Sequence, residues 1–266
     1  METYRLKIGA VTCIIISDGS SEISLERAQQ ILISAPPDEL AAAFHALDIS
    51  PVSSMNCAVL QYGDHTMLID TGMGLTYQPA LGNLLAGLAA EGIQPEDITR
   101  VFITHCHGDH IYGIVNPDGA LTFPNADYVI NKVEWDSGMS REDIATKLAL
   151  IENKTTKFDV GDYLIPDVVY TIPLYGHTPG HTGFMVESEG EVLLGLVDTL
   201  HQVVQMQHPE WSPKFDSLPD VSPVIRRKML EHAAQYNRLT LFYHLPFPGL
   251  GHVQREADGF KWVPQS

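Results

Sequence analysis

The sequence Thr104-His105-Cys106-His107-Gly108-Asp109-His110 contains three histidines and one aspartate within six residues. A short apolar run, Val101-Phe102-Ile103, comes directly before it and predicts a buried strand. The glycine and the polar residues around it predict a turn that leads towards a helix. We therefore expect the cluster at the end of a strand, which is where α/β folds bind their ligands.

The spacing within this cluster favours metal binding. His105 and His107 are two residues apart, so in extended backbone their side chains project to the same side. Asp109 and His110 then follow around the turn. Neutral imidazole together with carboxylate suits zinc, iron, manganese or cobalt. Cys106 lies between the two histidines and points the other way, which favours a small buried thiol over a ligand.

The composition predicts one globular domain over residues 1–266. The chain is 44% hydrophobic with a mean hydropathy of −0.02, which is enough for a sizeable core. No apolar run approaches the roughly 18 residues of a membrane helix, and the N-terminal segment lacks the pattern of a signal peptide. Three cysteines do not make a disulfide framework and fit a reducing compartment. We therefore expect a cytoplasmic protein without a membrane partner.

The net charge limits the classes of partner. At −17, with a pI near 4.9, the chain repels phosphate backbones and anionic lipid surfaces. Nucleic acid is therefore not expected as a substrate. Small polyanions are disfavoured less strongly, because metal ions reverse the field locally.

Hydrophobic periodicity predicts two mixed sheets with helices outside. Helices expected over 25–32 and 37–47 precede the metal motif, so the segment 25–47 is a candidate cap or dimer element. The other expected elements are a strand over 6–17 that ends in a turn at 18–19, hairpins over 57–70 and 183–197, strands over 101–104, 127–130, 168–174 and 239–243, and helices over 81–91, 131–135, 141–151 (capped by Ser140) and 222–237.

Three later residues of metal-binding type also follow apolar strands. His177 follows the strand over 168–174, Asp198 follows the second strand of the hairpin over 183–197, and His244 follows the strand over 239–243. An aspartate at a strand end is most often a turn former. Four strand ends that all carry metal-binding side chains nevertheless indicate one shared site.

These motifs together resemble the metallo-β-lactamase-fold hydrolase superfamily over essentially the whole chain. The matching segments are His105-x-His107-x-Asp109-His110, Gly176-His177-Thr178, Asp198, His244 and Leu68-Ile69-Asp70-Thr71-Gly72. The resemblance implies an α/β (α+β) fold, a four-layer αβ/βα sandwich of two mixed sheets with helices outside. It also implies two metal ions at one edge of the sheets.

The resemblance assigns seven metal ligands. His105, His107 and His177 would hold one metal, whereas Asp109, His110 and His244 would hold the other, and Asp198 would bridge them. Seven ligands exceed what one tetrahedral ion needs, so two divalent ions are expected, with zinc favoured and iron, manganese or cobalt as alternatives. His181 is expected to support the site, and Asp70 to order the ligand turn.

A narrower resemblance is to the branch that holds methyl parathion hydrolase and dihydrocoumarin hydrolase. It depends on Asp198-Thr199-Leu200-His201 and on His244-Leu245-Pro246-Phe247-Pro248-Gly249. N-acyl homoserine lactonases commonly carry a tyrosine three residues after the bridging aspartate, where this chain has His201. Relatives in this branch dimerise, so a homodimer is expected. The candidates for the pocket wall are His201, His208, His252, Leu75, Trp135, Trp211 and Phe247, each with core packing or another structural role as the alternative.

The predicted function is hydrolysis of ester bonds by a hydroxide that the two metals share. Asp109, Asp198 and His201 are the candidate catalytic residues, and the expected substrates are lactones or aryl esters, with slow organophosphate triester hydrolysis as a side activity. The alternatives are an N-acyl homoserine lactonase of the quorum-quenching kind and, in another class, a non-haem iron oxidoreductase of the same fold. A non-catalytic metal-binding module is disfavoured by the complete ligand set.

Overall fold

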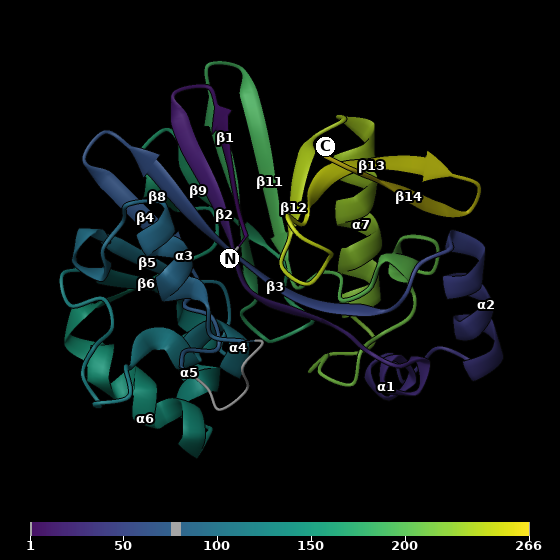
Figure 1. Cartoon of the computed structure of the whole chain (residues 1–266), viewed down its shortest axis with the longest axis horizontal. Coiled ribbons are helices and arrows are strands. Elements are labelled where there is room, and N and C mark those ends of the chain that lie inside the picture. The colour runs from purple at the N-terminus through teal and green to yellow at the C-terminus, as the bar shows by residue number, and fades with distance from the viewer. Residues whose placement is uncertain (1, 76–80, 266) are drawn as a thin grey trace.

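Two seven-stranded sheets pack face to face and carry helices on their outer sides (Figure 1). The computed structural model describes residues 2–75 and 81–265. The first sheet contains β1 (Thr3–Ile8), β2 (Val11–Glu22), β3 (Val52–Tyr62), β4 (His65–Ile69), β5 (Arg100–Ile103), β6 (Asp127–Asn131) and β7 (Thr155–Phe158) in chain order. The second contains β8 (Tyr163–Ile165), β9 (Val169–Pro173), β10 (Thr182–Ser188), β11 (Glu191–Val197), β12 (Leu239–Phe242), β13 (Leu250–Glu256) and β14 (Gly259–Pro264), also in chain order across the sheet. This arrangement confirms the predicted sandwich of two mixed sheets.

The helices lie outside the sheets and at the edge where the ligand loops gather. They are α1 (Leu25–Ile31), α2 (Pro37–Leu47), α3 (Leu84–Ala90), α4 (Gly108–Ile111), α5 (Lys132–Met139), α6 (Glu142–Ile151) and α7 (Ser222–Gln235), with short 3₁₀ turns η1 (Pro95–Asp97), η2 (Tyr112–Ile114), η3 (Glu152–Lys154) and η4 (Val203–Met206). No described helix has the length and apolar character needed to cross a membrane.

The main core fills the space between the two sheets. Phe102 of β5 contacts Phe184 of β10 edge-on, with ring centroids 6.4 Å apart, so the two sheets meet through their aromatic side chains. A second apolar cluster lies between the second sheet and α7, around Leu230 and Phe242. A third lies beneath α1 and α2, where Phe44 packs with Val204 and Trp211.

Parallel pairing brings the ligand-bearing strand ends to one edge of the sandwich. β4, β5 and β6 are parallel neighbours in the first sheet, and β11 and β12 are parallel neighbours in the second. Backbone bonds join the two sheets at this edge, because Thr182 N donates to Thr104 O (3.0 Å) and Asn56 N donates to Tyr243 O (3.0 Å). The loops that follow β5, β11 and β12 therefore meet.

The N-terminal half of the first sheet differs from the sequence-based prediction. The run over 6–17 forms two antiparallel strands joined at Gly9-Ala10, since β1 pairs with β2. The turn predicted at Asp18-Gly19 is an irregularity within β2, which continues to Glu22. A register shift of this kind keeps a strand paired, which alternation of residue types alone does not reveal.

Two further differences concern the helices and the C-terminus. Ser140 does not cap α6. It ends α5, where its hydroxyl donates to Ser137 O (2.6 Å), and the residue before α6 is Arg141, which makes no side-chain cap. The antiparallel hairpin of β13 and β14 was not predicted.

The segment 25–47, predicted as a cap or a dimer element, forms the helices α1 and α2, and we call it the cap segment. α1 and α2 are inserted between β2 and β3, which pair with each other as far as Glu22 and Val52 (Figure 1). Each of the two helices buries an apolar face against the segment that follows β11, as Phe44 and Val204 show.

Candidate metal centre

All seven predicted ligands converge at the edge where the strands end. His105 and His107 follow β5, and Asp109 and His110 lie in α4. The other three ligands follow β9, β11 and β12 and come from His177, Asp198 and His244. Gly176 permits the turn before His177, because it has a φ of +132° and a Cβ there would lie 2.7 Å from the Ser222 backbone.

The ligand atoms form two clusters that Asp198 connects. The described residues form four groups of three, and within each group the donor atoms lie within 4.8 Å of one another. The groups are His105, His107 and His177; Asp109, His110 and His244; His105, His110 and Asp198; and His177, Asp198 and His201. The first two groups are the two metal sites that the resemblance implies. Of the two groups that contain Asp198, one shares His105 with the first site and His110 with the second, and the other shares His177 with the first site.

Asp198 contacts ligands of both clusters. Its Oδ2 lies 3.4 Å from His177 Nε2 and 2.9 Å from His244 Nε2, and its Oδ1 lies 3.3 Å from His110 Nε2. Burial by itself raises the pKa of the Asp198 carboxyl, but the surrounding imidazoles outweigh burial and hold the pKa well below its usual range. The group is therefore an ionised carboxylate, as a bridging ligand must be.

Hydrogen bonds on the far side of the rings aim the metal-facing nitrogens. His110 Nδ1 bonds Asp70 Oδ2, His177 Nδ1 bonds Asp216 Oδ1 and His244 Nδ1 bonds Ser54 O, each at 2.8 Å. Carboxylates and carbonyls can only accept, so each of these rings carries a proton on Nδ1 and turns its Nε2 towards the cluster. This is the arrangement that metal-binding histidines require.

The donor set leaves buried polar atoms that a metal ion would satisfy. His110 Nε2, His177 Nε2 and Asp198 Oδ1 are buried and have no hydrogen-bond partner within the described part of the chain. Such atoms are costly unless something pairs with them, and these three converge from separate loops. The residues present therefore fit two divalent cations.

The loop through Cys106 is fixed by one buried carboxylate that sequence reasoning missed. Glu134 Oε1 accepts from Cys106 N (2.8 Å), while Oε2 accepts from Thr178 Oγ1 (2.7 Å) and Gly180 N (2.9 Å). One side chain on α5 thus ties the loop after β5 to the turn after β9. Cys106 belongs to none of the four donor groups found among the described residues, and burial raises the pKa of its thiol well above the usual value.

A second buried network supports His177 and was also not foreseen. Arg226 of α7 is fully buried, and its guanidinium donates to Asp216 Oδ2 (3.2 Å) and Thr199 O (2.6 Å). Asp216 in turn holds the His177 ring. Burial raises the pKa of Asp216, but His177 and Arg226 more than compensate and keep it below the usual range. An Arg–Asp–His chain therefore connects the core of α7 to the metal cluster.

Asp70 and His181 have the supporting positions predicted for them. Asp70 accepts from Thr104 N and Thr104 Oγ1 (both 2.8 Å) as well as bonding His110, so it links the ends of β4 and β5. His181 packs its ring 4.9 Å from that of His105, and its Nδ1 bonds Leu174 O. It belongs to none of the four donor groups.

His201 lies at the cluster but differs from the seven ligands. Its Nε2 is 3.5 Å from Asp198 Oδ2, and its ring stacks on that of His244 with centroids 4.9 Å apart. Its Nδ1 is buried and has no hydrogen-bond partner among the described residues. Burial lowers the pKa of His201 to about 4, which makes the ring neutral at pH 7.

A cavity of about 500 Å³ opens beside the cluster, and we call it the metal cavity. Its polar wall consists of Ser21, Arg27, Ser53, His107, Asp109, Asp198, His201, Gln202 and His244. Its apolar wall comes from Ile23, Ile31, Met55, Leu81 and Phe215.

Of the sequence-based candidates for the cavity wall, His201 lines the metal cavity, and the alternative of core packing holds for the two tryptophans. Trp135 and Trp211 are buried in apolar clusters, and Leu75 is mostly exposed away from the metal cavity. Among the described residues that line the metal cavity, neither His208 nor His252 occurs. Phe247 lines a separate cavity on the other side of His244.

Comparison with known proteins agrees with this geometry. The model of the metallo-beta-lactamase superfamily matches residues 51–243, which include six of the seven candidate ligands and end one residue before the seventh, His244. The chain belongs to the metallo-β-lactamase superfamily. It is accordingly a metal-dependent hydrolase with a binuclear divalent metal centre, and the resemblance seen in the sequence is confirmed at the level of the superfamily.

Two similar members of the superfamily are lactonases, and a third is described as a hydrolase. An N-acyl homoserine lactonase of Bacillus cereus is 30% identical over 233 residues, covering 79% of this chain and 85% of that protein. The structure of AidC, a dizinc quorum-quenching lactonase in complex with a product, superposes with a TM-score of 0.93 at 27% identity, covering 99% of this chain and 97% of AidC. The hydrolase AbOPH superposes with a TM-score of 0.85 at 26% identity, covering 99% of this chain and 97% of AbOPH.

The Arg–Asp–His chain generates a prediction on metal affinity. Asp216→Asn is expected to weaken Zn²⁺ binding by about ten- to a hundredfold, because the amide no longer offsets the positive charge of Arg226 and holds the His177 tautomer less firmly. Competition with a chromophoric chelator measures the affinity. Asp220→Asn, an exposed carboxylate in the same loop, is the matched control. Equal Zn²⁺ affinity in Asp216→Asn and wild type would show that the bond to His177 does not support the site.

Proposed function

We propose that this protein opens the ring of N-acyl homoserine lactones, with other lactones and aryl esters as further substrates and organophosphate triesters as slow ones. The observation that carries the proposal is a pair of three-ligand clusters joined by Asp198 and opening on a cavity with one polar and one apolar wall. Lactonases among the similar proteins support the choice of substrate. The oxidoreductase alternative receives no such support, because these relatives are hydrolases.

The proposed ligands are those that the resemblance assigned. His105, His107 and His177 would hold one ion, Asp109, His110 and His244 the other, and Asp198 both. Two divalent ions supply a hydroxide nucleophile at neutral pH and polarise the ester carbonyl. Zinc is the proposed metal, since imidazole and carboxylate donors suit it and AidC is a dizinc enzyme.

The chain's own residues would position the substrate. The apolar wall around Met55 and Phe215 accepts the acyl part of the lactone and excludes water from the ester. Asp109, Asp198 and His201 are proposed as the catalytic residues. His201 takes the place of the tyrosine common in N-acyl homoserine lactonases, and as a neutral ring it can donate a hydrogen bond to the leaving oxygen. The carboxylates of Asp109 and Asp198 would hold the two metal ions close to this leaving oxygen.

We also propose a single domain over residues 1–266, a homodimer and a cytoplasmic location, with neither nucleic acid nor membrane as a partner. One apolar cluster spans both sheets, which supports the single domain. All three cysteines are free and buried, which supports a reducing compartment. The net charge of −17 disfavours polyanions.

Activity after metal removal tests the proposed reaction. Protein purified without added metal is expected to contain two zinc ions per chain and to hydrolyse N-hexanoyl homoserine lactone. Dialysis against a chelator is expected to abolish turnover, and Zn²⁺ to restore it. Elemental analysis and pH-stat kinetics measure both quantities. One ion per chain at full activity would overturn the binuclear assignment, and no turnover of any lactone would overturn the substrate.

Asp198 is expected to matter more for rate than for substrate binding. Asp198→Asn changes the placement of the two ions relative to each other, and misplacing reacting groups by about 1 Å costs on the order of a hundredfold in rate. With both ions still bound, kcat should fall by that factor or more, while KM changes only a few-fold. Steady-state kinetics on the metal-replete variant measures this. A kcat near that of wild type with two ions bound would contradict the bridging role.

The homodimer can be tested directly. Leu25 and Ile33 of the cap segment are 46% and 62% exposed, and a second chain would cover such apolar surface. We therefore expect light scattering at micromolar concentration to give twice the mass of the chain. The exposed apolar residue Val224 of α7 lies outside the cap, so Ile33→Asp should shift the mass towards the monomer while Val224→Asp should not. A monomeric wild type would contradict the proposal.

A further inference from the structure

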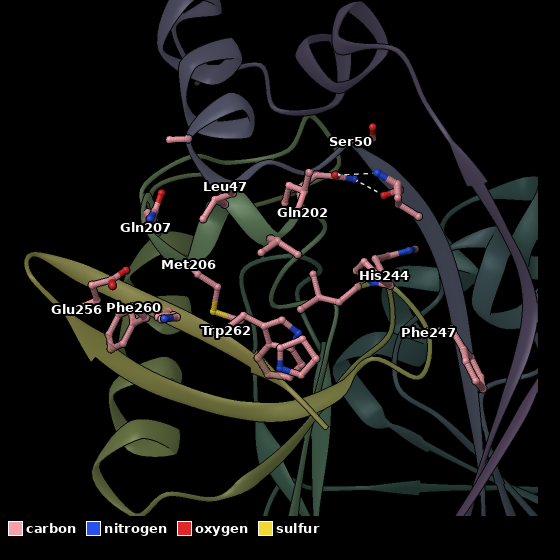
Figure 2. Close-up of a pocket in the computed structure, with 18 residues that line it drawn as sticks. Leu47, Ser50, Gln202, Met206, Gln207, His244, Phe247, Glu256, Phe260 and Trp262 are labelled. Carbon is pink, nitrogen blue, oxygen red and sulfur yellow. Dashed lines mark hydrogen bonds between the residues drawn. The ribbon is translucent and has the colours of Figure 1, made fainter. Parts of the chain in front are cut away.

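A second cavity of about 630 Å³ adjoins the metal cavity, and we call it the apolar cavity. It lies between α2, η4 and the hairpin of β13 and β14, and Met206, Phe260 and Trp262 form much of its wall (Figure 2). Figure 2 shows Gln202 and His244 at one end of it and Gln207 and Glu256 at the other. The end with Gln202 and His244 is the end that faces the metal centre.

Two side chains line both cavities and therefore separate them. They are Gln202 and His244. The adjacent residues of β3 divide between the cavities, since Val52 lines the apolar cavity and Ser53 lines the metal cavity, as alternate side chains of a strand must. His244 cannot move aside, because its Nδ1 is bonded to Ser54 O and its Nε2 faces Asp198. Gln202 is therefore the residue of this partition that can be changed without removing a candidate metal ligand.

Gln202 is held in place by its amide group. Its Nε2 donates to Val52 O (2.6 Å), and its Oε1 accepts from Val52 N (3.3 Å). The side chain thus pairs with the backbone of β3 as a neighbouring strand would. It is buried, with 4% of its surface exposed, so its carbon atoms fill the gap between the loop after β11 and the start of β3.

We propose that Gln202 sets the upper limit on the acyl chain length of the substrate, by closing the apolar cavity to chains that enter from the metal cavity. The proposal rests on the proposed function. With the partition closed, an acyl chain has only the metal cavity of about 500 Å³, which it shares with the lactone ring. With the partition open, the chain can continue past His244 into apolar surroundings formed by Val203, Leu245 and Met206.

The gain expected from opening the partition follows from burial of methylene groups. Each methylene that moves from water into an apolar cavity strengthens binding by about fourfold. Two to three methylenes are enough for a change of more than tenfold. Gln202→Ala is therefore expected to raise the ratio of kcat/KM for N-dodecanoyl over N-hexanoyl homoserine lactone by at least about tenfold relative to wild type.

Two variants separate the volume of residue 202 from its hydrogen bonds. Gln202→Leu loses both bonds to Val52 but keeps most of the volume, so the ratio should stay near that of wild type. Val203→Phe added to Gln202→Ala fills the apolar cavity and should remove the gain. Equal gains in Gln202→Ala and Gln202→Leu would overturn the proposal, because the cause would then be loosening of η4. If Gln202→Ala is not recovered folded, Gln202→Asn should give a smaller gain of the same sign.

A binding measurement distinguishes failure of this proposal from failure of the proposed function. The ring-opened N-hexanoyl and N-dodecanoyl homoserines are titrated calorimetrically into the zinc-loaded protein. Gln202→Ala should bind the dodecanoyl compound at least about tenfold more tightly than wild type does, and the hexanoyl compound with little change. This holds whether or not the lactones turn over. If wild type hydrolyses lactones and Gln202→Ala shows neither the kinetic nor the binding shift, the proposed role of Gln202 is wrong and the proposed lactonase function is retained.

Discussion

The metal centre depends on the hydrogen bond at the far side of each imidazole ring. A neutral histidine can point an unprotonated nitrogen at a cation only if its other nitrogen carries the proton and finds an acceptor. His110, His177 and His244 find theirs in Asp70, Asp216 and a backbone carbonyl. These acceptors lie directly after β4, in the loop before α7 and in β3. The segments that carry these acceptors therefore have to be folded before the imidazole rings can take up their orientation.

The convergence of the candidate ligands could be predicted from the sequence, whereas their division between two ions came from the resemblance to the superfamily. Each ligand loop follows an apolar strand, so its place at a sheet edge could be inferred without knowing which strands pair. His105 and His107 also have the alternation that puts two side chains on one side. The two-sheet architecture followed from the same strands. The resemblance also distinguished His177 from His181, because it assigns the ligand role to the first histidine of that turn.

The supporting residues could not be predicted in the same way. Glu134 and Asp216 are single carboxylates in a short helix and an irregular loop, and nothing in their local sequence distinguishes them from solvated charges. Their roles arise from contacts 28 to 46 residues away for Glu134 and 39 residues away for Asp216. Gln202 is similar, since its partner Val52 is 150 residues away. Turn predictions failed at Asp18-Gly19 for a related reason, because a paired neighbour strand carried β2 through an irregularity.

The cap is attached through a paired ribbon, and this limits how its length can vary. The outer ends of β2 and β3 pair up to Glu22 and Val52, and successive residues there face different cavities. Insertion or deletion of one residue in this ribbon would exchange Val52 and Ser53 between the two cavities and put a hydroxyl where an alkyl group had been. Insertion or deletion of two residues would keep each side chain on its own cavity and would only change the distance of α1 and α2 from the sheet. Length variation in this part of the fold is therefore expected to occur in even steps.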